Sequence, residues 1–416
     1  MNRRKLLISV SVALCACTLA SCFAADSEYE LHEWGVFSVP RGDAWAQRDM
    51  KMEWATFPEF FFKTWPTVKL PLSHPQAARK PVIFLHAEKP LSLELSIRFA
   101  EGRPLVWWPA TSYPRGDVKI TDKDRLTFSV ALIDPDPENP GKLAAPALQK
   151  VENGHWVDQL RAVNSVMLFT QSAPYASHGL EIANRRYPVS EKFIYYDGIM
   201  KAPAAPKVVR TGDSIELGSD NEYDWLDVMA IERDGTKLRA SKAWTDKVAA
   251  GAQKTRIELT DAVDIDKLKK EFSAKLAGAG LNADEAEALV KVWDEGIFKK
   301  DGLTLFYRIP QETYEKWLPL EATPAPKKIV RVGIVLHEHL EPELNARVDA
   351  LIAKLSSEEF EIREAAQKAL VQIGGAALPA LEKHFDDKDP EVSKTCKKIY
   401  EALDALPAME KAGTRD

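Results

Sequence analysis

Cysteine is scarce in this chain, and most of it lies at one end. Of the four cysteines in 416 residues, Cys15, Cys17 and Cys22 are close to the N-terminus and only Cys396 lies further on. The body of the protein therefore has no possible internal disulfide unless Cys22 takes part, so its fold must depend on a hydrophobic core. A chain of this length can bury one.

The chain also lacks an excess of basic residues. Lys+Arg 56 against Asp+Glu 62 gives a net charge of −6. A mildly acidic chain without a basic block has no electrostatic means of holding nucleic acid or a bare anionic membrane surface. Glycine (20) is less frequent than proline (26), and eleven tryptophans are present, a composition that favours strands and ordered loops over a bundle of helices.

The familiar catalytic motifs are missing as well. The sequence contains no HExxH, no GxSxG, no phosphate-binding loop, no dinucleotide-binding glycine motif and no CxxC pair. This favours a protein that is not an enzyme. An active site with a pattern of its own stays open as an alternative.

The first twenty-five residues have the pattern of an export signal. Arg3, Arg4 and Lys5 form a positive segment, and an uncharged apolar run follows from Leu6 to Ala20. The run is shorter than a membrane span, which needs about 20 residues, and suits a secretory signal peptide over residues 1–25. Its removal leaves 53 basic residues and a charge of 53 − 62 = −9. We expect the protein in the periplasm or cell envelope.

The segment from Leu19 to Cys22 resembles the lipobox of bacterial lipoproteins, in which the cysteine becomes the acylated first residue. By this interpretation cleavage falls before Cys22, and the lipid anchors the chain to a membrane without spanning it. The alternative is ordinary signal-peptidase cleavage after Ala24 or Ala25, with Cys22 incidental. Both interpretations imply export.

Residues 26–340 have the pattern of a β-rich body. Apolar and polar residues alternate from Leu91 to Phe99, which predicts a half-buried strand. A helical insertion is predicted at about 264–298, with Asn282 as an N-cap, and a stiff connection at 319–326. Further short strands are predicted at 81–86, 126–133, 166–169, 193–196, 215–217, 303–309 and 329–337.

Helical patterns replace the strands over residues 341–406, and a polar tail follows at 407–416. One apolar stripe contains Phe360, Ile362, Ala366 and Leu370. A shift of thirty residues places this stripe on a second one, with Ile362 on Val392. Such a period is typical of an α-solenoid of helix–turn–helix units. Two units are fewer than the roughly three that stability usually needs, so we expect them to dock on the body, on a partner or on another copy.

The predicted fold class is therefore α+β: a β-rich, sandwich-like body with helical insertions, followed by a short C-terminal α-solenoid. Segment 349–404, with FEIREAA from Phe360 and GAALPAL from Gly375, resembles the HEAT-type module common in planctomycete-like bacteria. The body, with LHEWGVF from Leu31 and EKFIYY from Glu191, is similar to exported planctomycete-type bacterial proteins of uncharacterised function. The resemblance implies a fold and a location, and it implies no catalytic residue.

One group of residues suggests a metal site. His337 and His339 are two apart at the end of a predicted strand, so both imidazoles would face one side and reach one Zn²⁺. His32 and Glu33 would add the third and fourth ligands if their strand lay beside the strand that ends at His337. The alternative is that these are ordinary polar residues at a strand end, with no cofactor in the protein.

The solenoid suggests a surface for a protein partner. Glu359, Arg363, Lys394 and Lys397 lie on the polar sides of their predicted helices, where stacked helices commonly present a groove. The alternative is a solvated face with i,i+4 ion pairs. We therefore expect a non-catalytic envelope binding or scaffold protein. The competing hypothesis is an envelope hydrolase or carbohydrate-active enzyme with its site near His337 and His339.

Overall fold

A computed structural model describes residues 29–39, 57–63, 75–109, 111, 124–133, 148–170, 189–201, 206–218, 221–251 and 254–404. The predicted signal peptide, Cys22 and the polar tail lie outside these residues. None of the helices in the described ranges is long and apolar enough to cross a membrane.

A large sheet runs through the body and contains thirteen of the described strands. At its centre β1 (Tyr29–Val39) lies parallel to β18 (Lys328–His337) and antiparallel to β3 (Pro75–Ala87). Outward from β18, the strands are β16 (Gly302–Ile309), β12 (Trp225–Asp234), β13 (Lys237–Ser241), β15 (Thr255–Thr260), β11 (Ser214–Gly218) and β10 (Lys207–Thr211). A further strand, β14 (Thr245–Val248), pairs with β12. Outward from β3, the strands are β9 (Ile194–Lys201), β5 (Arg103–Trp108) and β2 (Phe62–Lys63).

A second sheet packs on one face of the large one. Leu95 and Phe128 of the second sheet share a core with Leu31 and Phe37 of β1, so the two sheets are packed face to face as in a sandwich. Its strands are β17 (Leu320–Thr323), β4 (Ser92–Arg98), β6 (Arg125–Ile133), β7 (Met167–Thr170) and β8 (Val189–Glu191).

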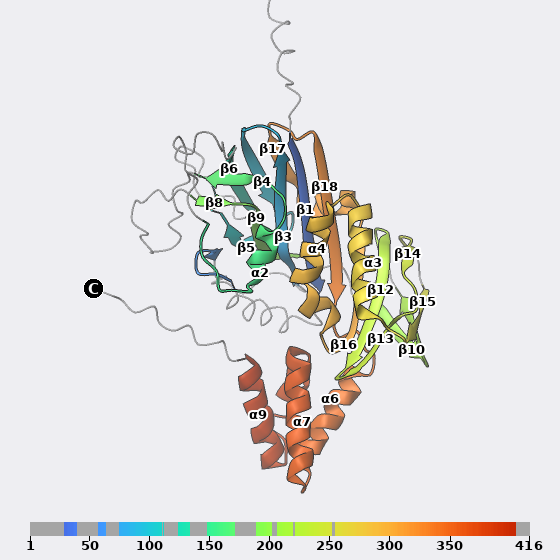
Figure 1. Ribbon diagram of the computed structural model, residues 1–416. Helices are drawn as coiled ribbons and strands as arrows, with labels where there is room; N and C mark the ends of the chain where they lie inside the picture. The colour runs from blue at the N-terminus through green and yellow to red at the C-terminus, as the bar shows by residue number, and fades with distance from the viewer. Residues whose placement is uncertain are drawn as a thin grey trace, which may run out of the picture.

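Helices cover the opposite face of the large sheet (Figure 1). In α3 (Ile265–Gly278) the buried residues Leu268, Phe272 and Leu276 are four apart, so they form one stripe that packs on the sheet. Side chains of β1 alternate between the two cores, because Trp34 and Val36 face these helices. The remaining helical elements of the body are α2 (Trp156–Arg161), α4 (Ala283–Val292), the π-helix η1 (Asp294–Phe298) and α5 (Gln311–Trp317).

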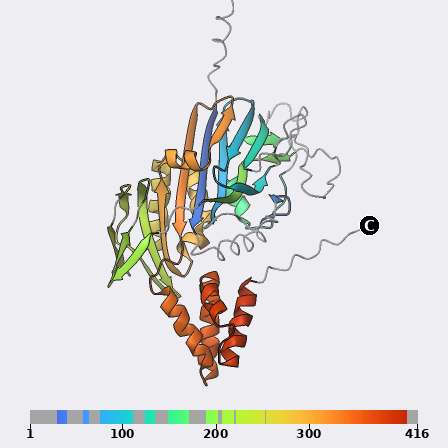
Figure 2. The same cartoon turned by 180° about the vertical axis from the view of Figure 1, so that it is seen from behind.

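The C-terminal helices form a module that projects from one end of the body (Figures 1 and 2). The two long helices begin at Phe360 and Pro390, a spacing of 390 − 360 = 30 residues. The module has a core of its own, in which Cys396 is buried, and burial raises the pKa of this thiol to about 11. Its elements are α6 (Leu344–Ala353), the 3₁₀ turn η2 (Lys354–Ser356), α7 (Phe360–Ile373), the 3₁₀ turn η3 (Gly374–Ala377), α8 (Leu378–Lys383) and α9 (Pro390–Asp404).

The structure confirms the predicted α+β class, with large sheets followed by C-terminal helices. Two details differ from the predictions. The segment 319–326 is more than a stiff connection, because β17 lies within it and pairs with β4. Phe360 and Ile362 do not belong to the apolar stripe that packs inside the module, because both side chains are exposed.

Candidate functional site

Exposed hydrophobic side chains concentrate on α7. Among the described residues four large hydrophobic side chains are exposed, and Phe360 (62%), Val371 (47%) and Ile362 (36%) all belong to this helix. Phe360 and Val371 are eleven residues apart, so at about 100° per residue they lie within about 20° of one another around the helix. They form an interrupted stripe along one side of α7, with the polar side chains of Glu364 and Gln367 between them.

The repeat explains the exposure of Ile362 but not that of the stripe. Its equivalent in the second unit, Val392, is 5% exposed because α9 packs against α7 and η2 of the preceding unit. Ile362 has no such cover, since β18 rather than a helical pair precedes α6. The positions equivalent to Phe360 and Val371 are Pro390 and Glu401, so the repeat itself does not require hydrophobic residues there.

The partner residues expected from the sequence fall into two groups. Lys394 and Lys397 are exposed on α9, and Glu359 is exposed just before α7. Arg363 is instead tied to the backbone, because its Nη1 donates to the carbonyl oxygens of Ser357 (2.6 Å) and Glu358 (3.0 Å). Arg363 therefore fixes the loop between η2 and α7, and its guanidinium also lies 5.8 Å from the centre of the exposed Phe360 ring. Its role as a partner-binding residue stays a prediction.

Lys394 and Lys397 occupy the repeat positions of Glu364 and Gln367, which lie between Phe360 and Val371 on α7. Because α7 and α9 are in contact and hold equivalent places in the two units, the apolar stripe and the two lysines belong to one side of the module. We call Phe360, Val371, Lys394 and Lys397 the α7–α9 surface.

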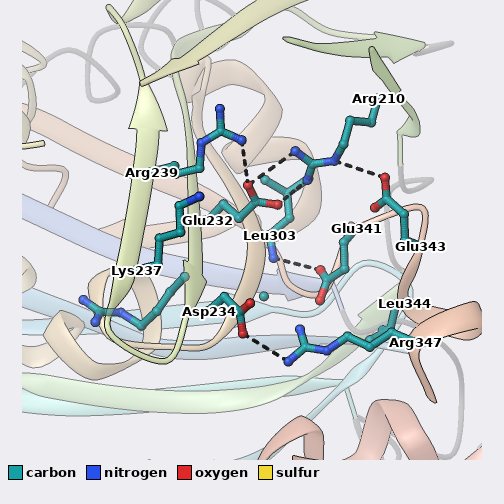
Figure 3. A pocket seen from close by; sticks show the side chains of 12 residues that line it. Arg210, Glu232, Asp234, Lys237, Arg239, Leu303, Glu341, Glu343, Leu344 and Arg347 are labelled. Carbon is teal, nitrogen blue, oxygen red and sulfur yellow. Dashed lines mark hydrogen bonds and ion pairs between the residues drawn. The ribbon is translucent and has the colours of Figure 1, made fainter. Parts of the chain in front are cut away.

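A polar pocket of about 320 Å³ lies where the module joins the body. Figure 3 shows charged side chains converging from the strands and from the start of α6. Arg210 pairs with Glu343 (3.1 Å), and Arg347 pairs with Asp234 (3.2 Å). Five basic and four acidic residues line the pocket together with three uncharged ones, so the pocket has no strong charge of one sign. The lining residues are Arg210, Glu232, Arg233, Asp234, Lys237, Arg239, Gly302, Leu303, Glu341, Glu343, Leu344 and Arg347.

The balance of charges identifies this pocket as a polar joint. Glu232 is paired with both Arg210 and Arg239, and Glu341 accepts a hydrogen bond from the Leu303 backbone nitrogen (2.8 Å). Since most of the charges are already paired with one another, the pocket holds α6 against the body strands and has little net charge with which to attract a free ion.

The predicted metal site of His337, His339, His32 and Glu33 is not formed. In the parallel pair β1–β18, His32 is beside Val330 and His337 is beside Val39, so they lie at opposite ends of the two strands. His337 contacts Tyr307 in the core between the sheets, whereas His32 faces α4 across the other side of the large sheet.

The two later histidines also fail to share a face. β18 ends at His337, and His339 has a left-handed backbone with φ of 55°, so the alternation expected of a strand does not reach it. His339 lies beside Glu341 (3.6 Å) and Gly302. His337 is fully buried, and burial lowers its pKa to about 3, so this imidazole stays neutral.

Glu33 has a structural role instead of a ligand role. As the neighbour of His32 on a strand it points to the opposite face, where it accepts a hydrogen bond from the Arg331 Nε at 2.5 Å. Tyr314 donates a second hydrogen bond to Glu33 at 3.0 Å, and Tyr196 donates a third. The carboxylate is therefore fully occupied.

His32 has partners that the sequence did not indicate. Its Nδ1 lies 2.9 Å from Oε2 of Glu285, and His86 Nε2 lies 2.8 Å from Oε1 of the same carboxylate. Burial raises the pKa of Glu285, but hydrogen bonds from the two imidazoles outweigh it and lower this pKa to about 2. Glu285 is three residues after Asn282, the spacing of a capping box, and that is the one signal in the sequence that marks it.

Comparison with known proteins gives no family. No protein-family profile matches the chain, and no curated protein sequence matches it significantly. Among solved structures, the Fcho1 mu homology domain of Danio rerio with bound Eps15 peptide aligns with a TM-score of 0.29 and 7% identity, over 76% of this chain and 95% of that chain. The yeast delta-COP-I mu-homology domain, complexed with a Dsl1 WxWxV peptide, aligns with a TM-score of 0.22 and 8% identity, over 75% and 96%. Likeness this distant supports no conclusion about the function of this chain.

Proposed function

We propose that this protein is a non-catalytic binding protein of the bacterial cell envelope, and that its helical module holds a partner protein on the α7–α9 surface. The observation that carries the proposal is the exposed stripe of Phe360 and Val371, which neither the core of the module nor its repeat requires. Large side chains of this kind are stabilised when a partner covers them.

The chemistry of the surface indicates the kind of partner. Phe360 and Val371 are about three helical turns apart, with Glu364 and Gln367 between them, so a second helix could contact both apolar side chains. Beside the stripe Lys397 lies 3.9 Å from Asp386 Oδ1 and 6.0 Å from the centre of the Phe385 ring, and Lys394 forms no ion pair with another described residue. The partner that fits is an amphipathic helix with acidic residues along one edge, since opposite charges steer and orient association.

The direction of the central strands supports a position for the helical module on the side of the body away from an anchored N-terminus. β1 and β18 run in the same direction, and β18 ends seven residues before α6 begins (344 − 337 = 7). Tyr29 therefore lies at the end of the body away from the module, separated from it by roughly 33 Å of strand. If Cys22 carries the lipid, the body stands between the membrane and the α7–α9 surface.

Binding is tested by recovery of partners from solubilised envelope with the purified chain. We expect the double variant Phe360→Ser/Val371→Ser to lose at least about tenfold in affinity, because two side chains remain uncovered. Val209→Ser is the matched control, since Val209 is exposed (55%) on β10 of the body. Equal recovery by the double variant, or by a chain that ends at residue 340, would overturn the proposal.

The anchor is tested separately. We expect Cys22→Ala to move the protein from the membrane fraction to the soluble fraction, because the thiol that carries the lipid is absent. Retention of this variant in the membrane fraction argues against acylation, and it leaves the test of the α7–α9 surface unaffected.

A further inference from the structure

Three potential metal ligands from distant parts of the sequence meet between the central strands of the large sheet and α4. His32 comes from β1, His86 from the end of the neighbouring strand β3, and Glu285 from the first turn of α4. One ligand atom of each lies within 4.8 Å of the other two. The two imidazole rings are 4.7 Å apart between their centroids. The cluster is built by the fold, since nothing in the chain order brings these residues together.

The burial of Glu285 makes the cluster unusual. Its side chain has no exposure, and its partners among the described residues are the two histidines and the backbone nitrogen of Asn282 (2.7 Å). No lysine or arginine of the described chain pairs with it. A buried carboxylate needs a compensating positive charge, and a bound cation supplies one more fully than a neutral imidazole does.

The separations are close to those of a coordination sphere. Zinc holds nitrogen and oxygen ligands at about 2.0–2.2 Å, which in a tetrahedron places the ligand atoms about 3.3 Å apart. The nitrogen–oxygen separations here are 2.9 and 2.8 Å, and one ligand atom of each residue lies within 4.8 Å of the other two. To hold an ion, separations up to this limit would have to shorten by up to about 1.5 Å, which side-chain rotations can supply.

A second carboxylate lies behind one of the ligands. The second nitrogen of His32, Nε2, faces the Glu30 carboxylate at 3.5 Å, and Glu30 is 3.8 Å from Lys328. His32 Nε2 makes no hydrogen bond at this distance, so Glu30 would fix the ring only after a small approach of the two groups. His86 is partly exposed (21%), so one side of the cluster is accessible to an ion from solution.

We propose that His32 Nδ1, His86 Nε2 and Glu285 bind one divalent transition-metal ion, for which Zn²⁺ is the probe. Two histidines and one carboxylate are a ligand set that zinc uses, with water at the fourth position. The ion would fasten α4 to β1 and β3, on the helix-covered side of the sheet. This site is independent of the α7–α9 surface, so failure of either proposal leaves the other intact.

The test uses the full purified chain, stripped of metal with a chelator, loaded with ZnCl₂ and desalted. We expect elemental analysis to find about one zinc per chain and the melting temperature to rise with added Zn²⁺. Glu285→Gln and His86→Asn should both lose the bound zinc and the rise. His86→Asn removes the most exposed ligand and is the variant of choice if Glu285→Gln does not fold.

His384→Asn is the matched control. His384 also pairs with a carboxylate, Asp387 at 2.7 Å, but in the helical module and partly exposed. This variant should keep its zinc. The absence of stoichiometric zinc in the wild-type chain would overturn the proposal and leave a hydrogen-bonded histidine–glutamate cluster. Equal zinc in wild type and in both ligand variants would also overturn it, since the ion would then lie elsewhere.

Discussion

Glu33 and Arg331 form an ion pair between neighbouring strands in the interior of the body. The two residues are directly opposite in the β1–β18 register, and both side chains are almost wholly buried. Arg331 also lies over the Tyr314 ring at 4.3 Å. A charge pair so placed stabilises little by itself, but each charge depends on the other because water cannot reach it.

We expect Glu33→Gln to lower the free energy of unfolding by about 3–5 kcal/mol, since it leaves the Arg331 charge buried and unpaired. Urea denaturation measures the change. Glu321→Gln is the control, because the pair of Glu321 with Arg125 is exposed and 3.7 Å long, and exposed pairs contribute about 0–1 kcal/mol. Equal effects of the two variants would show that the Glu33 pair is not buried as described.

His337 makes the stability of the body depend on pH. Its pKa is about 3 in the folded chain and near its ordinary value of 6.5 in the unfolded chain. The stabilisation is therefore complete above pH 6.5 and is lost as pH falls toward 3, because only the unfolded chain takes up the proton. Tyr307, the group that faces this imidazole, has a pKa well above its usual value because of burial, and stays neutral throughout.

Between pH 7 and pH 5 the loss from His337 is about 2 kcal/mol. We expect His337→Asn, measured by urea denaturation at both pH values, to show a pH dependence smaller by about that amount. An unchanged dependence would mean that His337 is protonated in the folded chain.

At the residue scale, the sequence shows which side chains could bind a metal, but it does not show which of them the fold brings into contact. It marks His32 and Glu33 as candidate ligands, but adjacent residues of a strand face opposite sides, so only one of them can join a given cluster. His86 and Glu285 reach His32 through the β1–β3 pairing and the packing of α4, which depend on contacts between distant segments.

At the scale of elements, the hydrophobic pattern predicts the helices, and each predicted strand overlaps a strand of the structure. The apolar stripes of α3 and α4 and the alternation of β4 correspond to buried faces in the structure. β17 is hidden because four residues flanked by prolines carry too little pattern to mark a strand. The exposure of Phe360 escapes prediction because periodicity identifies apolar residues, not which of them the fold covers.

Gly302, at the start of β16, is an element boundary that requires glycine. Its φ is 99°, and an added Cβ would lie 2.7 Å from Glu341 Oε1 and 2.8 Å from His339 Nδ1. We expect Gly302→Ala to cost about 1–3 kcal/mol of stability. Gly212→Ala is the control, since Gly212 has φ of 60° and no atom near its Cβ position. If thermal unfolding shows an equal loss in both variants, the contacts around Gly302 are not as close as described.

At the scale of the whole molecule, the body and the helical module have separate cores and meet across charged side chains. The pocket between them is closed by the pairs Arg210–Glu343 and Arg347–Asp234. Exposed pairs of this kind orient a module without adding much stability. The sequence anticipates a docked module, but it could not show that a polar joint makes the contact, because those charges come from segments more than one hundred residues apart (343 − 210 = 133).

The central claim is that the α7–α9 surface holds a partner protein. Site-specific photo-cross-linking tests it most directly, with the photoreactive residue at Glu364, which lies between Phe360 and Val371 on α7. Glu382, exposed on α8, is the matched control position. In solubilised envelope we predict one discrete adduct from position 364, absent in the Phe360→Ser/Val371→Ser background, and none from position 382. The same adduct from both positions, or no adduct from position 364, would contradict the account.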